Sequence, residues 1–305
     1  MLRPFELHRP ATADEACATL ARLGDDAVPY AGGTELLLLM KEGLLRPRHL
    51  VDVKRIPGLD AVVREDRRLT IGATVTHRAL ERADAVRMHC PVLASVARHV
   101  ANVRVRNVGT VGGNLAFADP HSDLATMLLA LDASVDLVSP RGRRTLTLDA
   151  FVRGAWDTDR APDELLTAVS FTPWAGQTAA AYVKFGLYER PTLGIAVTLL
   201  VEADERRRLC IADARIAVGC VNPRPARARD AEVRLLGAAV EDAEDVIAQV
   251  AARAADAADP ADDLHGSADY KRHMVAVFTR RALRAAVARA RGLAADARYP
   301  HAVLA

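Results

Sequence analysis

The chain has 305 residues, of which 50% are hydrophobic and 26% charged, as in a globular protein with a large buried core and two or three domains. Its 41 basic and 39 acidic residues leave a net charge of +2, which gives no reason to expect binding to nucleic acid or to a membrane surface. No apolar run resembles a signal peptide or reaches membrane-spanning length, so we expect a cytoplasmic protein without a transmembrane segment.

The first part of the chain is predicted to alternate helices and strands. Thr12 and Glu15 form a capping box for a helix over 13–23, which Gly24 ends. A strand over 27–30, a helix beginning at 36–40 and a strand over 49–53 follow. Because a helix connects the two strands, we expect them to pair in parallel.

The middle of the chain is predicted to form a second sheet with helices. A strand over 69–76 precedes two helices, over 77–87 and 91–102. Asp123 is placed to cap a helix over 124–131. The remaining strands of this sheet are predicted over 133–138, 143–148 and 165–171.

The segment Pro173-Trp174-Ala175-Gly176-Gln177 has the composition of a domain boundary. Beyond it, apolar alternation predicts three strands, over 180–186, 194–202 and 209–220. The rest of the chain is rich in Ala and Arg at helical spacing, which predicts helices over 229–237, 241–258 and 267–291.

Two glycine-rich segments carry the strongest functional signal. The first is Tyr30-Ala31-Gly32-Gly33-Thr34-Glu35, and the second is Arg106-Asn107-Val108-Gly109-Thr110-Val111-Gly112-Gly113-Asn114-Leu115. Glycine lets a backbone approach a ligand closely, and a turn that opens into a helix offers free N–H groups to an anion. Alone, each Gly-Gly pair is better explained as a plain tight turn. Together, the two turns would hold a diphosphate between them, which suggests a dinucleotide.

Other common sites are disfavoured. The chain contains neither Gly-x-Gly-x-x-Gly nor Gly-x-x-x-x-Gly-Lys-Ser/Thr, so a nicotinamide-binding fold or a P-loop is not expected. The four cysteines are scattered, without a Cys-x-x-Cys pair, and are read as buried or incidental thiols: Cys17, Cys90, Cys210 and Cys220. His77, His99 and His121 are not spaced as a set of metal ligands, so no metal site is expected on this chain.

Several further segments extend the pattern of the two turns: Ile71-Gly72-Ala73, Asp119-Pro120-x-Ser122-Asp123-Leu124, Lys184-Phe185, Gly219-x-x-x-Asn222-Pro223 and Gly266-Ser267-Ala268-Asp269-Tyr270-Lys271-Arg272. With these segments the chain resembles, from Pro4 to about Arg289, the flavin-binding medium subunit of the molybdenum hydroxylases. That family includes the medium subunit of carbon monoxide dehydrogenase and the flavin domain of xanthine dehydrogenase. The second glycine-rich segment is the most specific to the family.

The resemblance implies an α+β fold. A PCMH-type FAD-binding domain is expected over 1–176, as two α+β subdomains over about 1–55 and 56–176. A C-terminal domain of the carbon monoxide dehydrogenase flavoprotein type is expected over 177–292, with a three-stranded antiparallel sheet and a helix bundle. Residues 293–305 would form a tail.

The resemblance also implies which residues bind FAD. Gly32, Gly33 and Thr34 would give N–H groups and a hydroxyl to the diphosphate. Thr110, Gly112 and Gly113 would approach the same diphosphate or the ribityl chain, so that amide groups of both turns hold it. The other matching positions are Ala31, Glu35, Asn114, Asp123, Leu166 and Lys184.

Structural roles remain open for several of these residues. Asp123 would accept from flavin hydroxyls, serve as a helix N-cap, or do both. Asn114 would hold its turn or touch the ligand, and Leu166 would pack on a ring of FAD or belong to the core. Lys184 would stabilise the reduced flavin from a position near its N1–C2=O edge, or lie as a surface lysine on an edge strand. Glu35 is given no specific role.

Two further positions are less defined. Tyr188, with Glu189-Arg190-Pro191-Thr192, lies where some relatives place an aromatic ring over the isoalloxazine, but the local sequence departs from the commoner pattern. His121 is read as a loop residue, with proton exchange at flavin N5 left open.

By resemblance the chain is an electron-transfer subunit and carries no catalytic acid or base. Substrate would be hydroxylated at molybdenum on a large subunit, and electrons would pass through two [2Fe-2S] clusters of a small subunit to FAD here, and then to an external acceptor. The complex is expected to be a doubled heterotrimer. Two alternatives stay open: a self-contained flavin-dependent reductase on the same fold, and a scaffold that has lost its flavin. The benzoyl-CoA-reductase-type variant, with an inserted [4Fe-4S] segment, is rejected because the chain has neither the insertion nor clustered cysteines.

Overall fold

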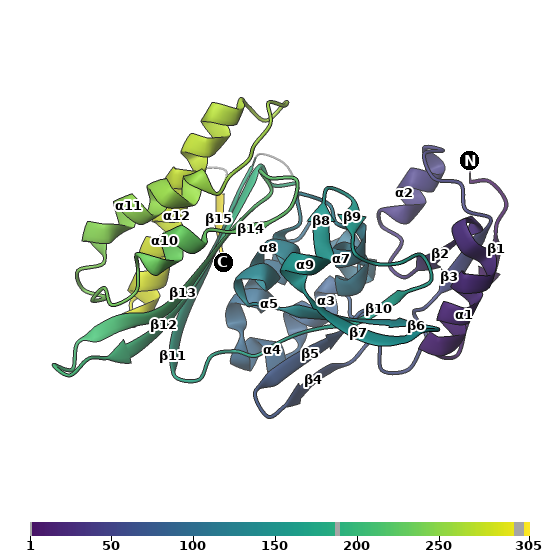
Figure 1. Cartoon of the computed structure of the whole chain (residues 1–305), viewed down its shortest axis with the longest axis horizontal. Coiled ribbons are helices and arrows are strands. Elements are labelled where there is room, and N and C mark those ends of the chain that lie inside the picture. Colours follow the sequence, from purple (N-terminus) through teal and green to yellow (C-terminus); the bar gives the residue numbers. More distant parts are fainter. Residues whose placement is uncertain (1, 187–189, 296–301) are drawn as a thin grey trace. The chain divides into compact units, whose positions relative to one another are not determined.

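The computed structural model describes residues 2–186, 190–295 and 302–305, whose elements are labelled in Figure 1. The chain divides into two compact units. Unit 1 comprises Met1–Ala118 and Ala133–Thr172, and unit 2 comprises Asp119–Asp132 and Pro173–Ala305. These are units of packing, and the domain boundary after residue 176 stays a prediction. The segment Asp119–Asp132 therefore packs with the C-terminal part of the chain although it lies within the predicted N-terminal domain.

Unit 1 begins with a three-stranded parallel sheet in the order β1-β3-β2. Its strands are β1 (Glu6–His8), β3 (His49–Asp52) and β2 (Ala27–Tyr30), and its helices are α1 (Ala13–Leu23), the 3-10 turn η1 (Gly24–Asp26) and α2 (Leu36–Lys41). Helix α1 begins where the Thr12 hydroxyl accepts from the Glu15 N–H and ends at Gly24, as predicted. Parallel pairing of β2 and β3 is also confirmed. Strand β1 was not predicted.

The second sheet of unit 1 is antiparallel, in the order β4-β5-β10-β6-β7. Its strands are β4 (Val62–Glu65), β5 (Arg68–Gly72), β10 (Leu165–Phe171), β6 (Ser134–Ser139) and β7 (Gly142–Thr147). The short helix α9 (Leu148–Phe151) and the pair β8 (Val152–Gly154) and β9 (Asp157–Thr158) follow β7. The predicted strands over 133–138, 143–148 and 165–171 are confirmed within a residue or two.

Five short helices lie between β5 and Ala118, where the first segment of unit 1 ends: α3 (His77–Arg82), α4 (Asp84–His89), α5 (Pro91–Arg98), α6 (Val103–Val108) and α7 (Val111–Phe117). The predicted helix over 77–87 is in fact two helices, because Ala83 has an extended backbone. The predicted helix over 91–102 ends at Arg98. The second Gly-Gly pair was expected in a turn, but it lies inside α7, and the turn itself is Gly109-Thr110.

Unit 2 is built on an antiparallel sheet in the order β14-β13-β12-β11-β15. Its strands are β14 (Ala226–Arg227), β13 (Leu209–Gly219), β12 (Leu193–Ala203), β11 (Gln177–Phe185) and β15 (Ala302–Leu304). The helices of the unit are α8 (Asp123–Ala130), α10 (Arg229–Val233), α11 (Glu244–Asp256) and α12 (Ala268–Ala290). The three long strands are as predicted, but the short strands β14 and β15 extend the expected three-stranded sheet to five strands among the described residues. Strand β15 lies in the range expected to be a tail, and α10 ends at Val233, before the predicted end at 237.

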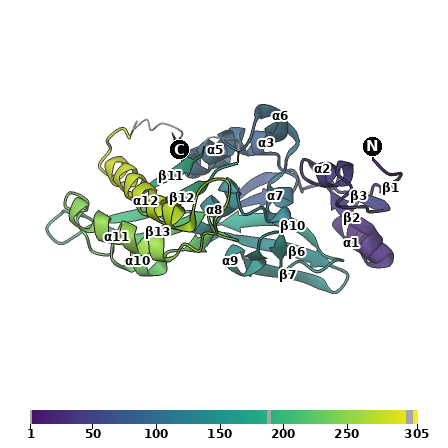
Figure 2. The ribbon, with the colours of Figure 1, turned by 90° about the horizontal axis from the view of Figure 1, so that it is seen from above.

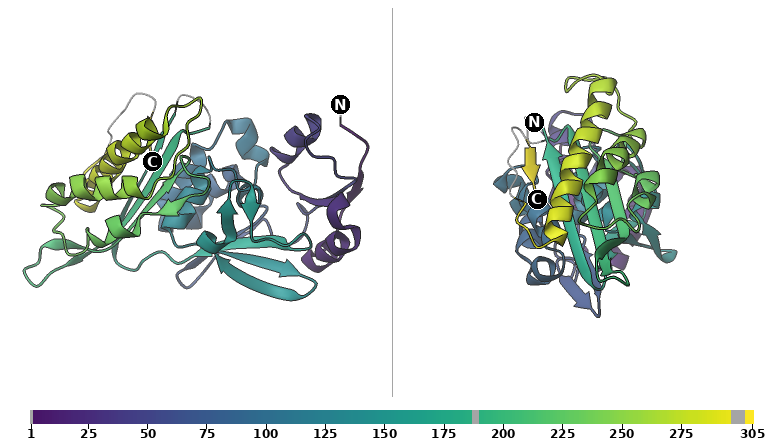
Figure 3. Two further views of the ribbon diagram at one scale, coloured as in Figure 1. Left: turned by 45° about the horizontal axis from the view of Figure 1, so that its top comes forward. Right: turned by 90° about the vertical axis from the view of Figure 1, so that its left-hand side faces the viewer.

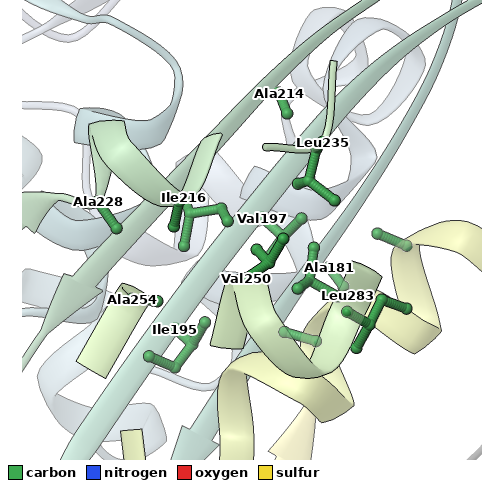
Figure 4. Close-up of a cluster of buried hydrophobic side chains, with 14 of the residues drawn as sticks. Ala181, Ile195, Val197, Ala214, Ile216, Ala228, Leu235, Val250, Ala254 and Leu283 are labelled. Carbon is green, nitrogen blue, oxygen red and sulfur yellow. The ribbon is translucent and has the colours of Figure 1, made fainter. Parts of the chain in front are cut away.

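The two faces of the unit 2 sheet are covered by different helices. Figure 2 and Figure 3 show α12 lying along the sheet, with α11 beside it. Figure 4 shows the core between them, where Ile195 and Val197 of β12 meet Val250 of α11 and Leu283 of α12. Because side chains alternate along a strand, residues of even number in β12 face the other way. There Thr198 donates its hydroxyl to the Ala130 carbonyl of α8.

Candidate functional site

The two glycine turns are in direct contact within unit 1. A Cβ atom added to Gly32 would lie 2.3 Å from the Val108 carbonyl oxygen and 2.8 Å from the Gly109 Cα. Such distances leave no room for any side chain, so the backbone of the first turn packs directly on the backbone of the second. This contact explains why glycine is required at Gly32, and it brings the two segments singled out in the sequence to one place.

The first turn carries backbone donors that the protein does not use. In the part of the chain that the structure describes, no acceptor is bonded to the N–H of Gly32, Gly33 or Thr34. Gly33 has φ of +71°, a left-handed conformation that favours glycine. The three residues are only half-buried. Successive amides that lack a partner form a concave binding place for an anion.

The second glycine-rich segment differs, because the amides of its Gly-Gly pair, at the start of α7, are already bonded. The Gly112 N–H donates to the Ala73 carbonyl at 2.9 Å, and the Gly113 N–H donates to the Thr110 hydroxyl at 3.1 Å. Thr110 is thus the N-cap of α7, and it is buried. The Gly112 and Gly113 amides therefore already have acceptors within the protein, and their approach to the diphosphate or the ribityl chain stays a prediction. Gly113 is exposed and carries no side chain, whereas Gly112 is buried against Ala73.

The Ile71-Gly72-Ala73 segment holds the second turn in place. The Ala73 N–H donates to the Thr167 carbonyl of β10, while the Ala73 carbonyl accepts from Gly112. A Cβ on Gly112 would lie 2.5 Å from the Ala73 Cβ, so α7 sits directly on this segment. Leu166, which precedes Thr167, is buried in β10 opposite Leu137. The segment therefore connects the antiparallel sheet to α7.

His77 is a buried neighbour of the second turn whose role the sequence did not reveal. A Cβ on Gly109 would lie 3.2 Å from the His77 Nε2, and the His77 N–H donates to the Gly109 carbonyl. Burial, with a further contribution from the charge of Arg106, lowers the pKa of His77 to about 4. The ring is consequently neutral at pH 7. Its buried Nδ1 atom has no hydrogen-bond partner among the described residues.

Two predicted site residues, Asp123 and Lys184, belong to unit 2 and pair with each other. The Lys184 Nζ lies 2.7 Å from the Asp123 Oδ2, and the Tyr182 hydroxyl donates to the Asp123 Oδ1 at 2.8 Å. All three side chains are buried. Asp123 is the first residue of α8, and the N-cap is Ser122, so the capping role predicted for Asp123 is wrong. Lys184 is not a surface lysine, and its strand β11 lies between β12 and β15.

Glycines make room for this ion pair. Lys184, Gly194 and Gly219 are register partners across β11, β12 and β13, so they share the face that α8 covers. A Cβ on Gly194 would lie 2.2 Å from the Tyr182 hydroxyl oxygen, and a Cβ on Gly219 would lie 1.8 Å from the Thr126 Oγ1. Because Gly194 and Gly219 carry no side chains, the Tyr182 hydroxyl and Thr126 of α8 can approach the backbone of the sheet at these two positions.

The other residues predicted near the flavin lie in loops, near helix ends or outside the described residues. Ala31 packs at the edge of the apolar cluster under α1. Glu35 is at the N-cap position of α2 without a capping bond from its side chain, and the Asn114 N–H donates to the Thr110 carbonyl. His121 pairs with Asp119 at 3.1 Å, and this bond helps to lower the pKa of Asp119 against the effect of burial. Tyr188 and Glu189 lie outside the described residues.

The family segments near the C-terminus have structural roles. The Asn222 side chain accepts from the Asp259 N–H at 2.7 Å. Ser267 caps α12 by accepting from the Tyr270 N–H, and the buried Lys271 pairs with Asp263 at 2.6 Å. These segments therefore hold the loops that enter the helices of unit 2. Among the helices that the structure describes, none is both long and apolar enough to cross a membrane.

Comparison with known proteins matches most of the chain. Residues 3–174 match the family model described as the FAD binding domain in molybdopterin dehydrogenase, and residues 190–286 match the CO dehydrogenase flavoprotein C-terminal domain. The chain is 35% identical to the carbon monoxide dehydrogenase medium chain of Hydrogenophaga pseudoflava, over 93% of this chain and 98% of that one. It is 34% identical to the nicotine 6-hydroxylase medium subunit of Paenarthrobacter nicotinovorans, over 92% and 96%. A solved carbon monoxide dehydrogenase from Hydrogenophaga pseudoflava superposes with a TM-score of 0.89 at 35% identity, over 95% of this chain and 99% of that one.

Proposed function

Since the chain belongs to the family of FAD-binding domains in molybdopterin dehydrogenases, we propose that it is the FAD-binding medium subunit of a molybdenum-containing hydroxylase. Its place in the complex is electron transfer between the [2Fe-2S] clusters of a small subunit and an external acceptor. Both of its domains match flavoprotein families over nearly their whole length, which supports this assignment for the entire chain.

The observation that supports FAD binding in unit 1 is the set of unbonded amides at Gly32, Gly33 and Thr34. A diphosphate is an anion that accepts several hydrogen bonds, and amide donors to it are charge-assisted and strong. The Thr34 hydroxyl adds a donor next to them. We assign the diphosphate to this turn, with the second turn as a wall that lacks side-chain bulk at Gly113.

When bound, FAD supplies a centre that takes up electrons singly and gives them up in pairs. The residues of this chain have a different task, which is to bind and orient it. Tyr30 packs against Gly33, since a Cβ on Gly33 would lie 2.6 Å from its ring, and the Lys54 Nζ lies 3.6 Å from the centre of the same ring. These contacts fix the first turn in one conformation. The donors are therefore already in position before the ligand binds.

We keep Asp123, Lys184 and Leu166 as predicted cofactor-binding residues, with a restriction on the role of the lysine. The charge of Lys184 is balanced by Asp123 at 2.7 Å. An ion pair produces a much weaker field at a distance than a single cation does. Any influence of Lys184 on the flavin is thus expected to act through a hydrogen bond more than through net charge.

The partners follow from the family. Medium chains of the carbon monoxide dehydrogenase type work with a small and a large subunit, and we propose that this chain does so in a doubled heterotrimer in the cytoplasm. The substrate is chosen by the large subunit, and the acceptor is a small molecule such as a quinone, dioxygen, a nicotinamide or a dye.

The test begins with the visible spectrum and metal content of the complex purified with its partners. A flavin spectrum together with iron and molybdenum, and a mass of twice one heterotrimer, is the expected result. Flavin without iron or molybdenum partners would instead favour a self-contained reductase, and a colourless chain would favour a scaffold.

The binding site itself is tested by FAD titration of the purified chain. Thr34→Ala removes one hydroxyl from the donor set, and a hydrogen bond to a charged group is worth about 1.5–3 kcal/mol, so affinity should fall by about tenfold or more. Thr19→Ala is the control, because its exposed hydroxyl bonds only to the Glu15 carbonyl. Unchanged affinity in Thr34→Ala would remove the first turn from the diphosphate site.

A further inference from the structure

A cluster of three potential metal ligands lies on the small parallel sheet of unit 1. Glu6 and His8 lie on β1, and His49 lies on the adjacent strand β3. Glu6 and His49 are register partners, and His8 is two residues along from Glu6. Because side chains alternate along a strand, all three project from the same face of the sheet. Pairing of the strands therefore collects residues that are far apart in the sequence.

The distances within the cluster fit one metal ion. The His8 Nε2 lies 3.0 Å from the His49 Nδ1, and the Glu6 carboxylate oxygens lie 3.7 Å from the His8 Nε2 and 3.5 Å from the His49 Nδ1. In a tetrahedral zinc site with bonds of about 2.0–2.1 Å, neighbouring ligand atoms are about 3.3 Å apart. One ligand atom from each of the three residues lies within 4.8 Å of the other two, so a single ion is within reach of all three side chains.

We propose that Glu6, His8 and His49 bind a divalent metal ion of borderline softness, with Zn²⁺ as the best fit. Two imidazoles and a carboxylate are a ligand set that Zn²⁺ accepts, and the fourth position is left for water. Without a metal ion, the His8 Nε2 and the His49 Nδ1, 3.0 Å apart, form a hydrogen bond in which the proton of the donor nitrogen lies between them. A metal ion replaces that proton and bonds to both nitrogens.

The surroundings limit the affinity but leave the site accessible. The Glu6 side chain is 66% exposed, whereas those of His8 and His49 are 19% and 22% exposed. In the described part of the chain no protein acceptor is bonded to the outer nitrogen of either ring. Such second bonds typically raise metal affinity by about 10–100-fold. The ion would therefore be exchangeable, and it would join β1 to β3 as a clip at the edge of the sheet.

The experiment uses the FAD-loaded full-length chain, stripped of metal by dialysis against a chelator. Zn²⁺ is then titrated in competition with a chromophoric chelator, and one site per chain is expected. His8→Gln/His49→Gln should abolish that site, and Glu6→Gln should weaken it by at least about tenfold. His273→Gln is the matched control, since this exposed histidine lies on α12 outside the cluster.

Two further measurements separate metal binding from effects on folding. Circular dichroism and FAD content should be the same in all variants, because Glu6 is exposed and the two histidines do not touch the glycine turns. X-ray absorption of the Zn²⁺-loaded chain should show two imidazole ligands, and these should disappear in the double variant. The proposal is overturned if the unmodified chain binds Zn²⁺ no better than His8→Gln/His49→Gln. Failure of the chain to bind FAD at the first glycine turn would not change this comparison of Zn²⁺ affinities.

Discussion

Lys184 and Asp123 form an ion pair that is nearly closed to water, with the Lys184 Nζ 2.7 Å from the Asp123 Oδ2. The pair joins the first residue of α8 to the central part of the unit 2 sheet. The Tyr182 hydroxyl donates to the second carboxylate oxygen, so both oxygens have a partner. Burial, together with the charge of Asp123, raises the pKa of Tyr182, which therefore stays a neutral donor.

The first prediction concerns this pair. Lys184→Met leaves the Asp123 carboxylate buried without its cation, and breaking a buried pair in this way costs about 3–5 kcal/mol. Lys184→Met/Asp123→Asn removes both charges and should recover most of that loss. Chemical denaturation measures both variants, with Lys41→Met, an exposed position, as the control. Equal stability of Lys184→Met and the unmodified chain would mean that the pair contributes nothing.

A second prediction follows from Gly32. Alanine there would place Cβ 2.3 Å from the Val108 carbonyl oxygen, so one of the two backbones must move. Overpacking of this kind costs up to about 3 kcal/mol, and FAD content on purification should fall with it. Gly154→Ala is the control, because its nearest neighbour is the Asp157 Cβ at 4.0 Å. If Gly32→Ala retained both stability and FAD, the contact between the turns would have no energetic importance.

The third prediction concerns the row of glycines under α8. A Cβ on Gly219 would lie 1.8 Å from the Thr126 Oγ1, so Gly219→Ala should destabilise the chain by about 1–3 kcal/mol. Thr126→Ala alone loses the bond from its hydroxyl to the Ser122 carbonyl. The double variant should be more stable than the sum of the two single effects predicts, and a double-mutant cycle measures this coupling. If the two losses of stability simply add, Gly219 and Thr126 are not in energetic contact.

The fourth prediction is a dependence of stability on pH. Burial lowers the pKa of His77 to about 4, below its value in the unfolded chain of about 6.5. The unfolded state therefore binds more protons between these values, and stability falls as the pH falls through that window. From pH 7 to pH 5 the loss from this group is about 2 kcal/mol.

Denaturation at a series of pH values measures this dependence. His77→Gln has no ring to titrate, so its stability should vary less with pH over the same window. His273→Gln, at an exposed position, should keep the full slope. An identical slope in His77→Gln and the unmodified chain would assign the effect to other groups.

Local signals in the sequence predicted the elements that they control. Thr12 and Gly24 fixed the bounds of α1 because capping depends on a few adjacent residues. Apolar alternation located β11, β12 and β13, because the side-chain pattern of a strand is also a local property of the sequence. Strands β1 and β15 were missed because three residues carry too little pattern, and they become strands only by pairing with β3 and β11.

In the candidate site, too, local sequence signals predicted some features, and others depend on contacts between distant parts of the chain. Motifs located both glycine turns, and the structure places Gly32 against Val108. Motifs could not show which amides remain free, because the partners of Gly112 and Gly113 depend on Ala73 and on the start of α7. The pairing of Lys184 with Asp123 was likewise hidden, since it depends on α8 packing against β11. The residue types of Lys184 and Asp123 predicted a polar contact for both, but only the fold shows that they contact each other.

The assignment of Asp119–Asp132 to unit 2 has a consequence for dissecting the protein. The chain leaves unit 1 at this segment, contributes α8 to the other unit, and then returns to unit 1 at Ala133. A truncated chain that begins at Pro173 would lack α8, and it would expose the sheet face that carries Tyr182 and Thr198. A truncated chain that ends at Thr172 would carry α8 without its sheet. Halves expressed separately should therefore aggregate, whereas mixing or co-expressing them should restore a soluble complex.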